Sequence, residues 1–187
     1  VVDNCIVDLS IHGEVFDLMG LSRTPFNKIN IHIGGAYGDK PSAMKRFCEN
    51  FHRLPDSVKT RLTVENDDKA SMYSVQDLYD GVYKVIGIPI VFDYHHHRFN
   101  TGDLSEQEAL ELAMSTWDGI VPVVHYSESR NIEQEDDKIR PQAHSDYVYD
   151  YIDTYDNRVD IMVEAKAKEL AVLKYKEIHN DTRKNSN

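Results

Sequence analysis

The stretch KINIHIGG, residues 28–35, decides how this chain folds. Its β-branched and polar residues alternate until two glycines interrupt the pattern, which predicts a short strand over 28–33. Residues 41–54 follow, with Pro41 in the first turn of an expected helix. A strand followed by a helix is the repeating unit of a parallel sheet, so this stretch predicts an α/β fold.

The same order recurs along the rest of the chain. Further strands are expected at 60–64, 88–92, 120–124 and 159–163. Further helices are expected at 3–20, 75–86, 104–117 and 166–178. The acidic stretch 128–138 is expected to be a mobile loop.

The composition limits the class of protein. With 187 residues we expect one domain over 1–179 and a flexible tail over 180–187. Hydrophobic residues at 41% and charged residues at 28% exclude wholesale disorder, and no apolar run is long enough to span a membrane. Cys5 and Cys48 have no disulfide or metal spacing, which favours a reducing compartment. The net charge of −11 argues against nonspecific coating of nucleic acid.

Each expected strand runs into a side chain that can bind metal. These side chains are His32, Glu65, Asp93, His125 and Glu164. Their spacing brackets the roughly 31 residues per unit of an eightfold βα barrel, in which all strands end at one mouth. The sequence therefore predicts a TIM (β/α)8-type barrel, here an incomplete barrel of about five βα units, which makes the chain a fragment or a truncated member of its family.

Ionisable groups crowded at one mouth need a counter-ion, and divalent cations supply it. Mixed imidazole and carboxylate ligands suit Zn²⁺, Mn²⁺ or Fe²⁺. Two or three such ions point to hydrolysis of a phosphodiester, although a sugar isomerase uses a similar mouth. The segment from Gly34 to Lys40 has a phosphate-binding composition but matches no nucleotide motif, so no nucleotide cofactor is expected.

Two loops add histidines to this mouth. The run His95, His96 and His97 begins two residues after Asp93, which ends a buried strand, so at least one of these rings is expected to enter the mouth. His144 lies in the loop after the fourth strand, from which a further ligand reaches the same place. From composition alone, each of these histidines is as readily a surface residue.

Several segments together resemble the UV damage endonuclease family. They are NIHIGG and GDK at 30–40, LTVENDD at 62–68, VFDYHH at 91–96, HYS at 125–127, HSDY at 144–147 and DIMVEAK at 160–166. The resemblance covers about residues 3–175. It implies a barrel of the xylose-isomerase-like type, related to endonuclease IV, that cuts DNA on the 5′ side of UV photoproducts with a cluster of Mn²⁺ ions.

The resemblance also implies roles for individual residues. His32 and Glu65 correspond to ligands of a first metal, and Glu65 would bridge to a second metal held by Asp93, His125 and Glu164. The implied ligands of a third metal are His96 and His144. On this basis the expected catalytic residues are Glu65, Asp93 and Glu164, and the expected DNA contacts are Tyr94, His97, Tyr147 and Lys166.

The chain also departs from the family. Some members carry a lysine where this chain has Val123, and the upstream family segment with a further metal-binding histidine is not in this sequence. We expect two or three Mn²⁺ ions, with Zn²⁺ or Mg²⁺ as alternatives, and damaged double-stranded DNA as partner. We expect no membrane partner, a monomer if the full barrel is present, and a cytoplasmic, nucleoid-associated location if the source is prokaryotic or viral. The alternatives are a sugar isomerase or epimerase, and an inactive truncated metal-binding domain.

Overall fold

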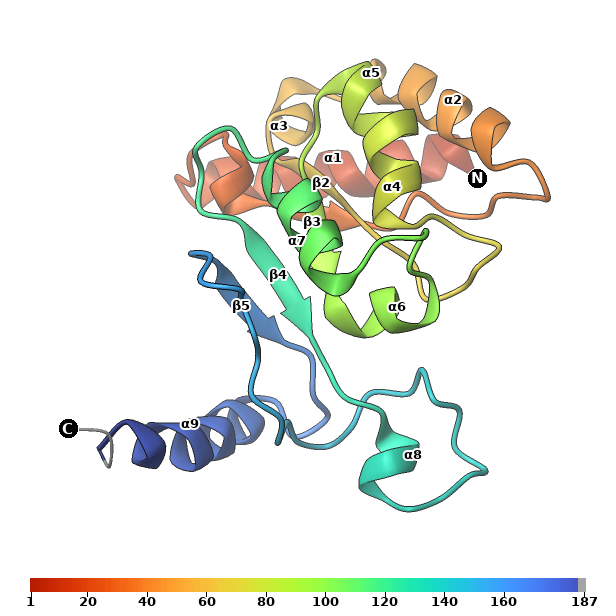
Figure 1. The fold of residues 1–187 in the computed structure, drawn as a ribbon. Coiled ribbons are helices and arrows are strands. Elements are labelled where there is room, and N and C mark those ends of the chain that lie inside the picture. Colours follow the sequence, from red (N-terminus) through yellow and green to blue (C-terminus); the bar gives the residue numbers. More distant parts are fainter. Residues whose placement is uncertain (185–187) are drawn as a thin grey trace.

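A sheet of five parallel strands forms the centre of the protein (Figure 1). The computed structural model describes residues 1–184, with side chains to residue 179. The strands pair in chain order and are β1 (Ile29–Ile31), β2 (Leu62–Glu65), β3 (Ile90–Asp93), β4 (Val123–Tyr126) and β5 (Asp160–Val163). Each expected strand is therefore present, and the carboxyl ends of all five lie at one edge of the sheet.

Helices connect the strands as the sequence predicts. In chain order they are α1 (Val2–Leu18), the 3-10 turn η1 (Pro25–Asn27), α2 (Lys40–Phe51), α3 (Asp56–Lys59), α4 (Val75–Leu78), the π-helical η2 (Tyr79–Tyr83), α5 (Lys84–Ile86), α6 (Tyr94–Phe99), α7 (Glu106–Met114), α8 (Arg130–Glu133) and α9 (Glu169–Lys184).

Three short helices were not expected from the pattern. The helix α3 lies in the loop before β2, and α6 begins directly after β3. The helix α8 lies within the acidic stretch that was expected to be a loop. The last helix, α9, continues to Lys184, so it includes part of the segment expected to be a tail. Residues 185–187 of that expected tail lie outside the described residues.

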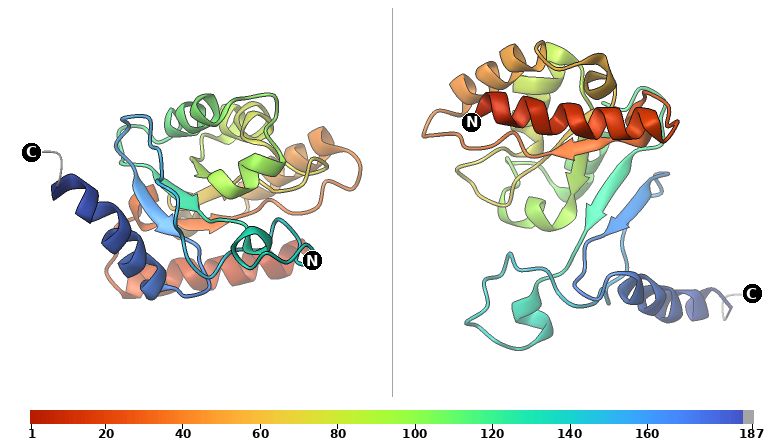
Figure 2. Two further views of the ribbon diagram at one scale, coloured as in Figure 1. Left: turned by 60° about the horizontal axis from the view of Figure 1, so that its bottom comes forward. Right: turned by 180° about the vertical axis from the view of Figure 1, so that it is seen from behind.

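The five strands curl into half of a barrel, which confirms the predicted α/β fold and incomplete TIM-type barrel. All neighbouring strands are parallel. At one side of the sheet Ile29 of β1 lies opposite Leu62 of β2, and at the other side Val123 of β4 lies opposite Asp160 of β5. Figure 2 shows that β4 and β5 extend from the helical layer toward α8 and α9. No helix in the described part of the chain is long and apolar enough to cross a membrane.

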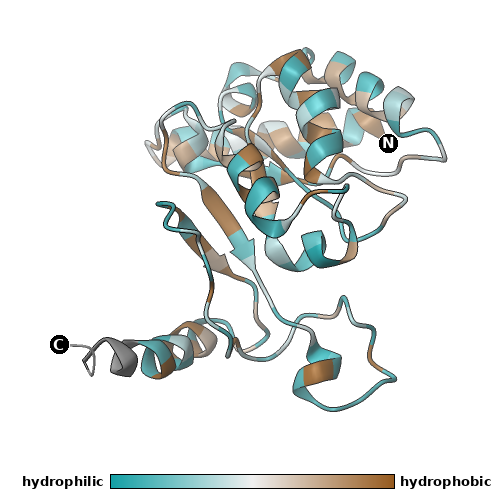
Figure 3. Ribbon diagram, viewed as in Figure 1, coloured by the Kyte–Doolittle hydropathy of each residue, from teal (hydrophilic) through white to brown (hydrophobic). Residues whose placement is uncertain are grey.

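The core lies around β2 and β3. All residues of these two strands are buried, whereas Asp160, Ile161 and Met162 of β5 are exposed. In Figure 3, β4 is hydrophobic in its first part and hydrophilic toward its carboxyl end, which His125 and Tyr126 form. The polar residues at the ends of the strands thus lie next to a well-packed apolar core, which fixes the positions of their backbones.

A buried arginine fastens α1 to the amino end of β2. Arg61 is fully buried, and its guanidinium donates hydrogen bonds to the carbonyl oxygens of Leu21, Ser22 and Ser57 and to the carboxylate of Asp17. Nearby, Gly13 of α1 approaches α3 so closely that an added Cβ would lie 2.6 Å from the Ser57 hydroxyl. This end of the sheet therefore serves stability, opposite the end that carries the polar site.

Candidate metal centre

Glu65, the last residue of β2, is the hub of the polar cluster. Its Oε1 lies 3.4 Å from Nδ1 of His96 and 3.8 Å from Nε2 of His32, and its Oε2 lies 3.2 Å from Nδ1 of His125. The side-chain amide of Asn30 donates a hydrogen bond of 2.6 Å to Oε2. One buried carboxylate thus faces three imidazoles that come from three other elements.

Asp93 ends β3 and begins α6. Its Oδ1 accepts a hydrogen bond of 2.8 Å from the backbone N–H of His96, which caps the helix and turns the His96 ring toward the centre. Asn66 holds this corner, because its side chain accepts from the N–H of Asp93 and donates to the carbonyl of Asp93. The second oxygen, Oδ2, is buried without a hydrogen-bond partner. An unpartnered buried carboxylate oxygen is a free ligand position.

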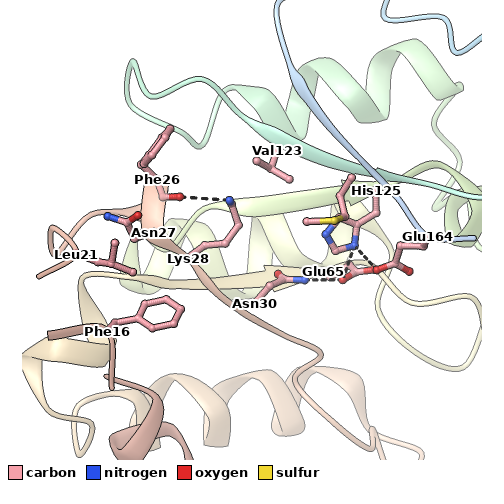
Figure 4. A pocket seen from close by; sticks show the side chains of 11 residues that line it. Phe16, Leu21, Phe26, Asn27, Lys28, Asn30, Glu65, Val123, His125 and Glu164 are labelled. Atoms are coloured by element: carbon pink, nitrogen blue, oxygen red, sulfur yellow. Dashed lines mark hydrogen bonds and ion pairs between the residues drawn. The ribbon is translucent and has the colours of Figure 1, made fainter. Parts of the chain in front are cut away.

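His125 and Glu164 extend the cluster toward β5. Nδ1 of His125 lies 3.2 Å from Oε1 of Glu164, and the backbone N–H of Glu164 donates to the carbonyl of Tyr126 (Figure 4). His144 reaches the same residue from the loop, with its Nδ1 3.7 Å from Oε2 of Glu164 and 3.0 Å from the Glu164 carbonyl oxygen. Glu164 therefore joins a strand residue and a loop residue to the centre.

The crowded charges shift the pKa values of several members. Asp67 and then Glu65 raise the pKa of His32 above its ordinary value. Burial lowers the pKa of His125, but Glu65 and Glu164 outweigh burial and raise it. Burial would raise the pKa of Glu65, yet the imidazoles, His125 first, hold it well below its ordinary value. Glu65 is thus ionised at neutral pH, as a metal ligand must be.

Asp93 behaves in the opposite way. Burial raises its pKa to about 7, and the imidazole of His96 only partly offsets this. A buried carboxyl group with one unpartnered oxygen is stabilised in its ionised form by a nearby cation. The buried carboxylates and imidazoles of this cluster therefore fit a divalent cation.

Two groups of side chains have ligand atoms close enough to hold an ion. One is His32, Glu65 and His96, and the other is Glu65, Asp93 and His125. Glu65 belongs to both groups, so its two oxygens can serve neighbouring ions. The seven side chains expected to bind metal all lie in this cluster or in contact with it, at the carboxyl ends of the strands.

The expected DNA contacts divide into two pairs. Tyr94 and His97 are buried, with the Tyr94 hydroxyl donating to the carbonyl of Asp153 and the His97 ring packed near Phe92. These two side chains face the protein interior, because α6 turns directly after Asp93 and carries them inward, so in this structure they present no surface to DNA. Tyr147 is half-buried and Lys166 is exposed, and both remain accessible.

The sequence analysis did not identify three polar residues of the centre as functional. Asn30 and Asn66 position Glu65 and Asp93, and Asp67 places its Oδ1 3.0 Å from Nδ1 of His32. The sequence did contain a signal for Asn30, because it lies two residues before His32, the spacing that places side chains on one face of a strand. Residues such as Asn66 and Asp67 follow a strand end but have no spacing that distinguishes them from loop residues.

The glycine-containing loop after β1 does not form a phosphate cradle. Asp39 caps α2, since its carboxylate accepts hydrogen bonds from the N–H and the hydroxyl of Ser42. Lys40 pairs with Asp77 at 2.8 Å. A carboxylate at the helix start repels an anion, which argues against phosphate binding by this loop.

A cavity of about 590 Å³ leads to the centre (Figure 4). Glu65, His125 and Glu164 lie at one end of it, and the apolar side chains of Phe16 and Phe26 lie at the other. The metal-capable groups are therefore reachable from solvent.

Comparisons with known proteins agree on one family. A family model described as UV-endonuclease UvdE matches residues 1–184. A UV DNA damage endonuclease of Bacillus cereus (strain Q1) is 36% identical over 185 residues, which cover 94% of this chain and 55% of that protein. One of Bacillus velezensis (strain DSM 23117 / BGSC 10A6 / LMG 26770 / FZB42) is 38% identical over 182 residues, which cover 91% of this chain and 53% of that protein.

A solved structure shows the same arrangement. The crystal structure of SacUVDE is similar with a TM-score of 0.77 and 32% identity, over 95% of this chain and 58% of that chain. The chain thus spans a little over half the length of the relatives that it matches.

Proposed function

Because the chain belongs to the UV-endonuclease UvdE family, we propose that it carries the catalytic centre of a metal-dependent DNA repair endonuclease. The proposed reaction is hydrolysis of a phosphodiester bond on the 5′ side of a UV photoproduct in duplex DNA. The proposed cofactor is Mn²⁺, as two or three ions. The proposed oligomeric state is a monomer if the full barrel is present, and the proposed location is the cytoplasm if the source is prokaryotic or viral.

The observation that carries this proposal is the position of Glu65. Its carboxylate faces His32, His96 and His125 at 3.2 to 3.8 Å, and it belongs to both groups that can hold an ion. Divalent ions bound there would activate a water molecule and stabilise the oxygens of the phosphodiester. No side chain is needed as a covalent nucleophile in such a reaction.

The roles of the ligands are proposed from the family resemblance, and the contacts described above support them. His32 and Glu65 are proposed to hold the first ion, and Glu65, Asp93, His125 and Glu164 the second. His96 and His144 are the proposed ligands of a third ion, although His96 also lies within reach of the first, in one group with His32. Asn30 orients Glu65 through its hydrogen bond, which fixes the carboxylate for bridging.

The DNA is proposed to lie across the carboxyl ends of the strands. Lys166 is exposed beside Glu164 and can contact a phosphate, and Tyr147 lies in the loop that carries His144. Tyr94 and His97 are left out of this surface, because both are buried.

The proposed reaction is tested by incision of a UV-irradiated supercoiled plasmid, with protein in excess so that slow incision is detected. We expect nicks in irradiated plasmid above those in unirradiated plasmid, dependent on added Mn²⁺ and removed by EDTA. Glu164→Gln should slow incision about tenfold to 100-fold, because it weakens one ligand and a contact of His125. Glu169→Gln, which changes an exposed carboxylate on α9, is the matched control. Equal nicking of both plasmids, or nicking unaffected by EDTA, would contradict the proposal.

The pH dependence of the protein's stability should change when metal is added. In the metal-free protein His32 and His125 have raised pKa values and that of Asp93 is about 7, so the folded state holds protons that the unfolded chain releases. The stability associated with these protons is present at lower pH and is lost as pH rises through the folded pKa values. His95, whose pKa burial lowers to about 4, titrates below this window.

We therefore expect the thermal midpoint in EDTA to fall between about pH 6.5 and pH 8. Added Mn²⁺ should raise the midpoint more at pH 8 than at pH 6.5, because metal and protons compete for the same groups. Thermal unfolding followed by circular dichroism measures both effects. A stabilisation by metal that is the same at both pH values would exclude histidine ligation.

A further inference from the structure

Arg98 presents a fixed positive charge beside the candidate metal centre. It is exposed on α6, and its Nη2 donates a hydrogen bond of 3.1 Å to the hydroxyl of Tyr126, the last residue of β4. Its Cζ also lies 5.6 Å from the centroid of the Tyr126 ring. Because Tyr126 is buried and neutral, the pair of contacts orients the guanidinium without neutralising it.

The carboxylates nearest to Arg98 are engaged elsewhere. Oε1 of Glu128 accepts hydrogen bonds of 2.9 Å from the backbone N–H groups of Tyr149 and Asp150. Oε1 of Glu106 accepts a hydrogen bond from the hydroxyl of Tyr155. Among the described residues, no carboxylate oxygen lies within the 4.0 Å ion-pair distance of the Arg98 guanidinium.

Four other arginines of the chain lie within ion-pair distance of a carboxylate. Arg23 and Arg61 share Asp17, Arg53 pairs with Asp3, and Arg130 lies 3.7 Å from Asp146. Arg98 therefore combines an oriented guanidinium with donors that no carboxylate occupies, which is the state expected of a group that binds an anion from solution.

Its place in the fold identifies the anion. Tyr126 directly follows His125 in β4, so its ring lies on the opposite face of the strand, and Arg98 holds it at the outer rim of the sheet where β3 and β4 end. The helix α6 packs against β4 at this point. The centre itself is rich in carboxylates, and the chain carries a net charge of −11, so a polyanion that enters this mouth needs a local cation.

We infer that Arg98, held on Tyr126, binds a backbone phosphate of the DNA strand that passes the metal centre. This inference rests on the proposed function and assigns a DNA-binding residue to it. The planar guanidinium can bind two phosphate oxygens at once, which a lysine cannot do. Phosphate contacts carry no base information, so Arg98 sets the position of the strand and does not select the lesion.

The test measures how DNA binding depends on salt. Fluorescence anisotropy gives the dissociation constant of the 187-residue chain for a fluorescein-labelled duplex, with and without UV irradiation, between about 50 and 200 mM KCl. The variants are Arg98→Gln, Arg98→Lys and Tyr126→Phe. Arg158→Gln is the matched control, since it removes the same charge from an exposed residue at the opposite, amino end of β5.

Loss of one phosphate contact should reduce the slope of log K against log salt by about 0.9. We expect this reduction for Arg98→Gln on irradiated and unirradiated duplexes alike, and no reduction for Arg158→Gln. Arg98→Lys should keep the slope but bind more weakly, and Tyr126→Phe should bind more weakly because the guanidinium loses its hydrogen bond. Circular dichroism checks that each variant is folded.

The failures can be told apart. If the unaltered chain binds no DNA, the proposed function and this inference fall together. If the chain binds DNA and cuts it in a metal-dependent way, but Arg98→Gln and Arg158→Gln have equal slopes, only the inference on Arg98 is wrong.

Discussion

Replacing Glu65 with alanine is expected to lower the affinity for Mn²⁺ by at least about 100-fold and to abolish metal-dependent incision. The carboxylate is the one group that belongs to both sets of ligands, so its removal impairs two ion positions at once. It also leaves His32, His96 and His125 without the charge that they share. No other single substitution in the centre removes so many contacts.

Metal content after dialysis, and a titration with Mn²⁺, measure this effect. Glu49→Ala is the control, because Glu49 is an exposed carboxylate on α2, outside the cluster. Glu65→Gln keeps the volume of the side chain and tests whether the charge itself is needed. Full metal stoichiometry and unchanged affinity in Glu65→Ala would exclude Glu65 as a bridging ligand.

Arg61→Met is expected to destabilise the protein by about 3 to 5 kcal/mol. The substitution leaves the carbonyl oxygens of Leu21, Ser22 and Ser57 without the donors that they now have, and it leaves the carboxylate of Asp17 with fewer partners. A buried polar group without a partner loses free energy that water cannot restore. The loss should appear as a lower midpoint of urea unfolding.

Arg23→Met provides a matched comparison. Arg23 also pairs with Asp17, but its side chain is 52% exposed, so its loss should lower the midpoint of urea unfolding much less than the loss of Arg61. Similar losses for the two variants would mean that the buried hydrogen bonds of Arg61 contribute little. Metal affinity should remain unchanged in both, because Asp17 lies at the other end of the sheet from the centre.

The sequence predicted the sheet because its signals are local. β-branched runs bounded by glycines, prolines and polar residues mark all five strands, and a parallel sheet brings the residues after them to one edge. His32, Glu65 and Asp93 could therefore be placed together without knowledge of their contacts. The structure adds the distances, and it shows that Glu65 lies at the middle of the group.

The orientations of the side chains of His95, His96 and His97 could not be predicted in the same way. Asp93 caps a helix of six residues, and this geometry turns His96 toward Glu65 while it buries His95 and His97. A run of three identical side chains has no periodicity from which such a turn could be inferred. Likewise, the contact between Asp67 and His32 depends on the path of a loop that no sequence pattern describes.

The order of the strands also bears on how the centre assembles during synthesis. Within the described sheet, each strand from β2 to β5 pairs with the strand made just before it, so none of these strands has to insert between two earlier ones. His32, Glu65 and His96 all lie on the first three βα units, and this half of the centre can close as soon as those units leave the ribosome. Glu164 arrives last, directly after β5. The docking of β4 and β5 then completes the cluster, because His125 and Glu164 come from the ends of these two strands.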